Sequence, residues 1–467
     1  MSNSITIPQA FIDSSLSHME EEEMKRFLGS LDNPSPVSVR VNPYKLDSKP
    51  SLNGVPWSKY GFFLDNRPHF ITDPFFHSGI YYVQESASMF IEHLYNHIFS
   101  DASPLKILDL CAAPGGKSTH ISSLAGPGNL VVSNEVIKPR AGILKENIIK
   151  WGLGNTIVTN NDPRNFNALP EFFDLIIADV PCSGEGMFRK TPEARSEWSP
   201  GNVDMCASRQ RRIISDIWGS LKKGGILIYS TCTFNQTENE ENIGWITEEY
   251  DCEHIEIPSV PEWNISEGEV NGHHTFRFYP HKTNSEGLFV CALGKSGEHK
   301  LLKEKKKKQS GNYTHVSKDK IRNLSEWVEQ PEYMTFYQRN DGTIHTAYRN
   351  IFDESREIMN SLNVIYSGVE MGKLYGNELK PSHSLSLFHS VNTDRVPGTN
   401  LDLEAAVNYL RKNDVDPKLF AEGINMVAYN DKPLGWIKRI GNRCNNLYPK
   451  ELRIINNEIG INKDSFL

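Results

Sequence analysis

The sequence predicts an α/β protein built around a parallel, Rossmann-like sheet, and three observations support this fold class. Residues 104–135 follow the order strand, glycine turn, helix, strand, which is a βαβ unit with an expected right-handed crossover. Two later apolar runs, 173–179 and 224–230, have the composition of further buried strands. A basic stretch at 296–311 then divides the 467-residue chain, which is long enough for two to four domains.

The βαβ unit begins with an apolar run at 106–110 that carries the acid Asp109 near its end. Small residues fill the following loop at 111–117, where the adjacent Gly115 and Gly116 let the backbone approach a ligand closely. The loop lacks both the glycine spacing of a P-loop and the G-x-G-x-x-G dinucleotide fingerprint. It therefore favours a compact, nearly neutral adenosyl ligand, with a plain helix cap as the alternative.

Helical spacing over 118–124 and an apolar run at 130–135 complete this unit, and the pattern continues with a strand at 156–159 and a helix at 206–221. Acidic residues recur where the predicted strands end: Asp109, Glu135, Asp162 and Asp179. Because the carboxyl ends of parallel strands line one crevice, we expect these side chains to meet there. Glu135 is placed to accept hydrogen bonds from ribose hydroxyls.

The seven cysteines are odd in number, and no two lie within four residues of each other. This pattern disfavours a disulfide framework and a zinc site, so we expect reduced thiols and no metal. Cys182 and Cys232 follow neighbouring strands, so both thiols could face the crevice. A thiolate there could add to carbon 6 of a cytosine and activate carbon 5 for methylation. Two buried, inert cysteines are the alternative interpretation.

The formal net charge of −8 is unevenly distributed along the chain. It is −11 over residues 1–295, +4 over 296–311 and −1 over 312–467. The lysine run at 305–308 is typical of a solvated linker, although it could also be an RNA-facing tether. No apolar run reaches the roughly 18 residues of a membrane span, and the N-terminus has no secretory pattern, so we expect a cytoplasmic protein without a membrane partner.

Several ordered blocks resemble the signature motifs of the Nop/Sun family of RNA cytosine-5 methyltransferases. They are residues 109–118, 179–186, 229–234 and 238–242, with flanking matches at 38–43, 84–89 and 277–281. Residues 366–372 and 435–450 look like the tail of the bacterial members that methylate small-subunit ribosomal RNA, which ends in a PUA-like module. The resemblance covers roughly residues 30–455.

The resemblance implies a role for each matching residue. Cys232 matches the nucleophile, and Cys182 matches the cysteine that assists release of the methylated RNA. Asp179 matches the acid that hydrogen-bonds the ring and contacts the cofactor, and Lys117 lies near the target base in such enzymes. The implied S-adenosylmethionine pocket comprises Cys111, Ala112, Ala113, Pro114, Gly115, Gly116, Lys117, Glu135, Asp162 and Asp179, with Glu135 on the ribose and Asp162 on the adenine edge.

The implied organisation is an N-terminal α+β RNA-binding segment, a Rossmann-like methyltransferase domain and a β-rich PUA-like module. The expected divisions are 1–95 for the N-terminal segment, 96–295 for the catalytic domain, 296–311 for the linker, 312–385 for an intermediate domain and 386–467 for the PUA-like domain.

RNA is the expected partner because positive charge and aromatics gather in the tail. Residues 433–453 carry a local +4 with Trp436 and Tyr448 interleaved, although a half-buried strand with ordinary surface charges would look similar. The RNA-binding candidates are Arg189, Lys190, Lys438, Arg439 and Arg443. We expect a monomer that methylates small-subunit ribosomal RNA, free or in the assembled subunit. A tRNA methyltransferase, a DNA methyltransferase attacking through Cys182 and a non-catalytic assembly factor are the alternatives.

Overall fold

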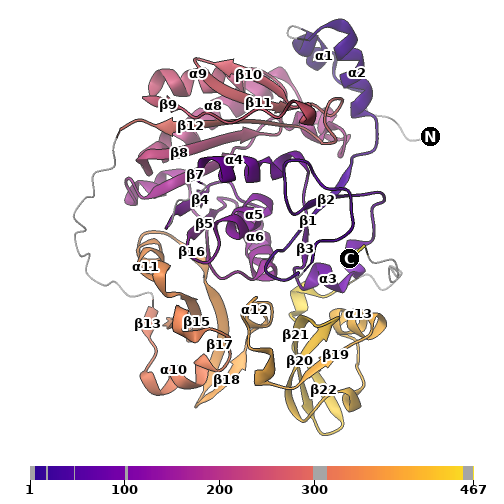
Figure 1. The fold of residues 1–467 in the computed structure, drawn as a ribbon, viewed down its shortest axis with the longest axis vertical. Coiled ribbons are helices and arrows are strands. Elements are labelled where there is room, and N and C mark those ends of the chain that lie inside the picture. The colour runs from indigo at the N-terminus through magenta and orange to yellow at the C-terminus, as the bar shows by residue number, and fades with distance from the viewer. Residues whose placement is uncertain (1–5, 17–18, 47, 100–103, 298–312, 456–465) are drawn as a thin grey trace.

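The computed structural model describes residues 6–16, 19–46, 48–99, 104–297, 313–455 and 466–467. Figure 1 shows a large sheet with helices in the upper part of the molecule and two smaller sheets from the C-terminal third below it. The predicted basic linker lies outside the described residues except for residues 296 and 297.

In its described residues, the N-terminal segment forms four α-helices and a small antiparallel sheet of order β2-β1-β3. Its elements are α1 (Gln9–Leu16), α2 (Glu21–Leu31), β1 (Val37–Val41), β2 (Gly61–Leu64), α3 (Pro74–His77), β3 (Tyr81–Val83) and α4 (Ile91–Ile98). Helix α4 packs on α5 of the catalytic domain, so this segment lies directly against the βαβ unit.

The central sheet has ten strands in the order β10-β11-β12-β8-β7-β4-β5-β6-β16, with β9 paired to β12. Its parallel strands are β4 (Lys106–Asp109), β5 (Leu130–Asn134), β6 (Thr156–Thr159), β7 (Phe173–Asp179) and β8 (Leu221–Thr231). Antiparallel strands extend it: β9 (Cys252–His254), β10 (Ser266–Val270), β11 (His273–Phe278) and β12 (Leu288–Lys295). The prediction of a Rossmann-like α/β core is confirmed.

The parallel strands β4, β5 and β7 are rich in buried apolar residues because both faces of the sheet are covered there. In β4, Ile107 belongs to the core beneath α4 and α5, whereas Leu108 belongs to the core beneath α8. The covering helices are α5 (Gly116–Ala125), α6 (Lys138–Trp151), α7 (Ala194–Glu197), α8 (Pro200–Trp218) and α9 (Glu240–Glu249). Helix α8 begins at Pro200, before the predicted start at 206, because the Ser199 hydroxyl caps it by accepting from Asn202 N.

The C-terminal third forms two antiparallel-rich sheets. The first contains β13 (Tyr313–His315), β14 (Met334–Arg339), β15 (Thr343–Tyr348), β17 (Val369–Tyr375) and β18 (Glu378–Pro381). The second contains β19 (Gly398–Asn400), β20 (Gly423–Tyr429), β21 (Lys432–Ile440) and β22 (Arg443–Asn446). The helices of this part are α10 (Lys318–Ser325), α11 (Phe352–Ser361), α12 (His383–Ser386) and α13 (Leu403–Arg411).

The catalytic sheet does not end at residue 295. Strand β16 (Val364–Ser367), from the segment expected to form a separate intermediate domain, pairs antiparallel with β6. Asn160 N also donates to Asn363 O at 3.1 Å. The second C-terminal sheet in turn contacts the N-terminal segment, where His77 Nδ1 lies 3.1 Å from the Tyr448 hydroxyl. Figure 1 shows this sheet beside α3.

Candidate active site

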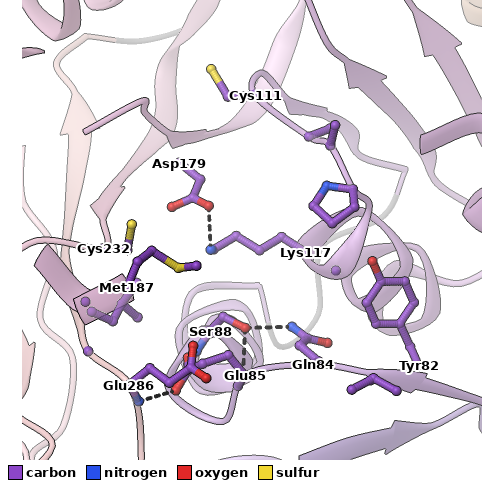
Figure 2. Close-up of a pocket in the computed structure, with 18 of the residues that line it drawn as sticks. Tyr82, Gln84, Glu85, Ser88, Cys111, Lys117, Asp179, Met187, Cys232 and Glu286 are labelled. Atoms are coloured by element: carbon purple, nitrogen blue, oxygen red, sulfur yellow. Dashed lines mark hydrogen bonds and ion pairs between the residues drawn. The ribbon is translucent and has the colours of Figure 1, made fainter. Parts of the chain in front are cut away.

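A cavity of about 330 Å³ opens at the carboxyl ends of β4, β7 and β8, where the strand order of the sheet reverses. Figure 2 shows Cys111 and Asp179 on one wall and the Lys117 side chain reaching across the middle of the cavity. Cys232 lies to one side, and Glu85 belongs to the opposite wall. The cavity therefore brings residues from the N-terminal segment together with three strand ends of the catalytic sheet.

The loop between β4 and α5 is held in place by α6. Arg140 Nη2 donates to Ala113 O, and Asn147 Nδ2 donates to Pro114 O, both at 2.8 Å. Gly115 has a φ of +115°, a backbone region that favours glycine, and it turns the chain into α5. Six of the seven predicted loop residues line the cavity: Cys111, Ala112, Ala113, Pro114, Gly116 and Lys117.

The carboxylate of Asp179, at the end of β7, contacts one side chain from α5 and one from β8. Lys117 Nζ lies 2.9 Å from Asp179 Oδ2, and the Ser230 hydroxyl donates to Asp179 Oδ1 at 2.8 Å. Burial opposes the ammonium charge of Lys117, but the Asp179 charge and hydrogen bond outweigh it, so the pKa of Lys117 is raised. A positively charged donor and a hydrogen-bonded carboxylate thus face the cavity side by side.

Asp109 is a fully buried acid at the end of β4 that also lines the cavity. Its Oδ2 accepts from the Ser118 hydroxyl at 2.6 Å, whereas its Oδ1 has no hydrogen-bond partner among the described residues. Burial raises the pKa of Asp109 to about 7. An unpartnered buried acceptor beside a glycine loop fits a ligand that carries hydroxyl and ammonium donors, as S-adenosylmethionine does.

The two cysteines at the strand ends come together. Cys182 Sγ lies 3.1 Å from Cys232 Sγ. Cys232 lines the cavity, and Cys182 lies behind it, outside the cavity lining. The contact with Cys232, together with burial, raises the pKa of the Cys182 thiol well above its ordinary value. One sulfur is thus presented to a ligand, and the second is held against the first.

Glu135 and Asp162 lie further along the sheet edge and do not line the cavity. Glu135 is buried, and its carboxylate accepts from Ile137 N at 2.9 Å. The Asp162 carboxylate caps a short 3₁₀ helix by accepting from Arg164 N at 3.2 Å. The structure therefore places these two acids at successive strand ends, as expected, but beside the cavity rather than in it.

The two RNA-binding residues predicted in the catalytic domain, Arg189 and Lys190, lie in different environments. Arg189 donates to the backbone oxygens of Asn33, Pro34 and Ser285, so its guanidinium connects the N-terminal segment to the domain. Lys190 lines the cavity and lies 3.5 Å from a carboxylate oxygen of Glu286.

The C-terminal candidates lie on β21 and β22. Lys438 and Arg443 are exposed, whereas Arg439 Nη1 donates to Phe420 O at 2.6 Å. The two aromatics of this tail are buried, as in the alternative interpretation of a half-buried strand. Trp436 and Tyr448 are 1% and 2% exposed, and the Trp436 indole N–H donates to Ser382 O at the start of α12.

The wall contributed by the N-terminal segment was not predicted as part of the site. Tyr82, Gln84, Glu85 and Ser88 line the cavity. The Glu85 carboxylate accepts from Ser88 N and from Glu286 N. It therefore connects the N-terminal segment to the residues just before β12, which also line the cavity. The family-like block at 84–89 was the available signal, since it is a motif rich in polar side chains directly after a strand.

Metal-binding clusters and membrane-spanning helices are both absent from the residues that the structure describes. Within those ranges, no group of three or more histidine, cysteine or acidic side chains could hold a metal ion. No helix in that part of the chain is long and apolar enough to cross a membrane.

Three segments match families of known proteins. Residues 100–294 match the family described as 16S rRNA methyltransferase RsmB/F, and residues 7–86 match the N-terminal domain of 16S rRNA methyltransferase RsmF. Residues 397–454 match the methyltransferase RsmF PUA domain.

Curated relatives and solved structures agree with these matches. The ribosomal RNA small subunit methyltransferase F of Escherichia coli K12 is 30% identical over 480 residues, covering 96% of this chain and 97% of its own length. The Cronobacter sakazakii protein of the same description is 29% identical over 479 residues, with the same coverage. Among solved structures, PH0851 is 25% identical with a TM-score of 0.55, covering 62% of this chain and 66% of its own. NSun6 from Pyrococcus horikoshii, solved with the S-adenosylmethionine analogue SFG, shares the fold at 21% identity and a TM-score of 0.51, covering 62% of this chain and 99% of its own.

Proposed function

The chain belongs to the family of bacterial small-subunit ribosomal RNA methyltransferase F, and from this premise we propose that it methylates carbon 5 of a cytosine in 16S ribosomal RNA through a covalent bond from Cys232. The observation that carries the proposal is the placement of Cys232 in the same cavity as the Lys117–Asp179 pair. A cofactor of the S-adenosylmethionine type supplies an electrophilic methyl group when it is bound.

The proposed chemistry starts from the weak nucleophilicity of cytosine carbon 5. The Cys232 thiolate adds to carbon 6, which places the electron pair on carbon 5 in an enamine. Asp179, acting as the acid, would donate a proton to ring nitrogen 3 as the thiolate adds, so that the adduct is a neutral enamine, and Lys117 would lie within reach of the base. After methyl transfer, loss of the carbon-5 proton and elimination of the Cys232 sulfur restore the aromatic ring, and Cys182 assists this release.

The same geometry supports the proposed cofactor site. Residues 111–117 border the cavity with small side chains, and Asp109 offers an unpartnered carboxyl oxygen among the described residues. The adenosyl end would extend toward Glu135 and Asp162 at the next strand ends. A cavity of this size is within the range of small-molecule sites, roughly 300–1,000 Å³.

RNA has to deliver a single base to this cavity. We propose that the target cytosine is flipped out of the RNA and that Lys190 at the mouth contacts a flanking phosphate. Lys438 and Arg443 on the C-terminal module would hold more distant RNA by charge. A protein acting on ribosomal RNA in this way would work in the cytoplasm, as a monomer.

Covalent trapping on RNA that contains 5-azacytidine tests the proposal. The adduct should be lost in Cys232→Ala and retained in Cys182→Ala, while both variants bind S-adenosylmethionine like the parent chain. An adduct that survives in Cys232→Ala and disappears in Cys182→Ala would instead assign the DNA-type mechanism and exchange the roles of the two cysteines.

The substrate is tested separately with three RNAs: small-subunit ribosomal RNA, the assembled subunit and tRNA. Methyl transfer to either ribosomal form and not to tRNA is the expected result, and bisulfite sequencing of the product locates the cytosine. Transfer to tRNA alone would place the chain with the tRNA enzymes. Failure to methylate any of the three, with RNA binding intact, would favour a non-catalytic assembly factor.

A further inference from the structure

The two loops that carry the cysteines are tied together by two buried acids. Glu185, on the loop after Cys182, accepts from Phe234 N at 2.7 Å and from Asn235 N at 3.0 Å, both on the loop after Cys232. Glu238 follows the second loop and accepts from Ser183 N at 3.0 Å. Each acid therefore holds the backbone of the other loop.

Side chains complete this arrangement. Asn235 Nδ2 donates to Glu185 Oε1 at 3.0 Å and to Glu238 Oε1 at 2.8 Å, so one amide bridges the two acids. Trp198 Nε1 donates to Glu185, and Gln210 Nε2 donates to Glu238 at 2.7 Å. Both acids are 0% exposed, and all of these partners are donors. Burial raises the pKa of Glu238, and the hydrogen bonds from Ser183, Asn235 and Gln210 oppose that effect.

The backbones of the two loops also touch. Gly186 N donates to Cys232 O at 2.8 Å, and a Cβ on Gly186 would lie only 2.9 Å from that oxygen. This close approach sets the 3.1 Å separation between the Cys182 and Cys232 sulfurs.

Glu238 lies against the loop that carries Cys182. Its carboxylate is hydrogen-bonded to the backbone of Ser183, the residue directly after Cys182. The contact with Cys232, burial and the charge of Glu238 all raise the pKa of Cys182. Cys232, by contrast, borders the cavity together with the Lys117–Asp179 pair.

We propose that Glu238 is a positioning residue that decides which cysteine attacks the base: its carboxylate binds the backbone beside Cys182 and holds that loop behind Cys232, so that the attack belongs to Cys232. The proposal rests on the function proposed above. It also gives a role to the first residue of the block at 238–242, which the sequence marks without assigning a function.

The test follows the alkylation of each cysteine by iodoacetamide across a pH series, with the two modified peptides quantified by mass spectrometry. The parent chain is compared with Glu238→Gln and with Glu241→Gln, a control that removes an exposed acid from helix α9, which begins just after Glu238. In the parent chain, the pH midpoint for Cys182 should lie above that of an ordinary thiol, about pH 8.5. In Glu238→Gln, the midpoint for Cys182 should fall, and Glu241→Gln should match the parent.

An unchanged Cys182 midpoint in folded Glu238→Gln, judged by retained cofactor binding, would overturn the proposal. If that variant does not fold, the parent chain alone still decides, because a Cys182 midpoint at or below that of an ordinary thiol, about pH 8.5, contradicts the assignment. Either result would leave the trapping experiment with Cys232→Ala unaffected, so failure of this inference is separable from failure of the proposed function.

Discussion

Arg40 connects the N-terminal sheet to the first turn of α5, next to the proposed cofactor loop. Its guanidinium is 1% exposed and lies 4.3 Å from the centre of the Trp151 ring. It donates to Gln84 Oε1 at 2.7 Å, to Thr119 Oγ1 at 2.6 Å and to Gly116 O at 3.3 Å. We predict that Arg40→Met destabilises the fold and weakens cofactor binding.

The expected change in unfolding free energy for Arg40→Met is the difference between the contacts that are lost and the cost of burying the charge that is removed. Three hydrogen bonds from a charged donor contribute about 2 kcal/mol each, and a desolvated cation–π contact adds about 2 kcal/mol. Burial lowers the pKa of Arg40 to about 9, which corresponds to a cost of about 5 kcal/mol for burying the charge. Arg40→Met removes this cost, so about 5 kcal/mol of the lost contact energy is offset. The expected net loss is about 3 kcal/mol of unfolding free energy, a large part of a typical stability of roughly 5–15 kcal/mol.

Urea unfolding measures this loss, and calorimetric titration measures the affinity for S-adenosylmethionine. Because Gly116 and Thr119 lose their contact at the start of α5, the affinity should fall at least severalfold. Arg26→Met is the matched control, since Arg26 is exposed in the same segment. A loss below about 1 kcal/mol in Arg40→Met, or an equal loss in Arg26→Met, would refute the reasoning.

Three further predictions concern other parts of the chain. Burial lowers the pKa of His383 to about 3, so that between pH 6.5 and 3 the unfolded chain takes up a proton that the folded chain does not. The unfolding free energy should therefore fall as the pH drops, and His383→Leu should reduce that slope between pH 6.5 and 5 by about 1.1 kcal/mol per pH unit in urea unfolding. A Cβ on Gly152, the residue that caps the end of α6, would lie 2.0 Å from Leu387 O at a φ of +74°, so Gly152→Ala should lower the unfolding free energy by several kcal/mol. In the control Gly142→Ala, within α6, the added Cβ meets no atom within 4 Å, so this variant should be neutral or slightly stabilising in thermal unfolding. A double variant that reverses both charges, Lys438→Glu with Arg443→Glu, should weaken ribosomal RNA binding in filter assays at least tenfold and leave cofactor affinity unchanged. Unchanged RNA binding would show that this module is not part of the RNA-docking surface.

The central sheet was predictable because its strands are short, continuous apolar runs that end on polar residues. The observed β6 and β7 have the predicted bounds, and β4 and β5 are each one residue shorter. The glycine loop and the two cysteine loops lie at strand ends, so the topology of a parallel sheet was enough to place Lys117, Asp179 and Cys232 at one edge. The roles assigned to these residues remain predictions.

The parts that could not be predicted depend on contacts between distant segments. Strand β16 is only four residues long, and nothing local indicates that it pairs with β6. Trp436 and Tyr448 look like RNA-stacking residues beside basic neighbours, yet their exposure is decided by packing against α12, α13 and the N-terminal segment. Arg189 looks like a phosphate ligand, but three backbone oxygens surround it.

The sequence by itself determined the fold class and the chemical groups at the ends of the parallel strands, because apolar periodicity and glycine placement are local properties. Only the tertiary structure decided which groups share one cavity, how the N-terminal segment closes it, and how Glu185 and Glu238 hold the two sulfurs 3.1 Å apart. The physical reason is that burial, hydrogen-bond partners and the environment of a charge are set by segments far apart in the chain, which the order of residues does not reveal.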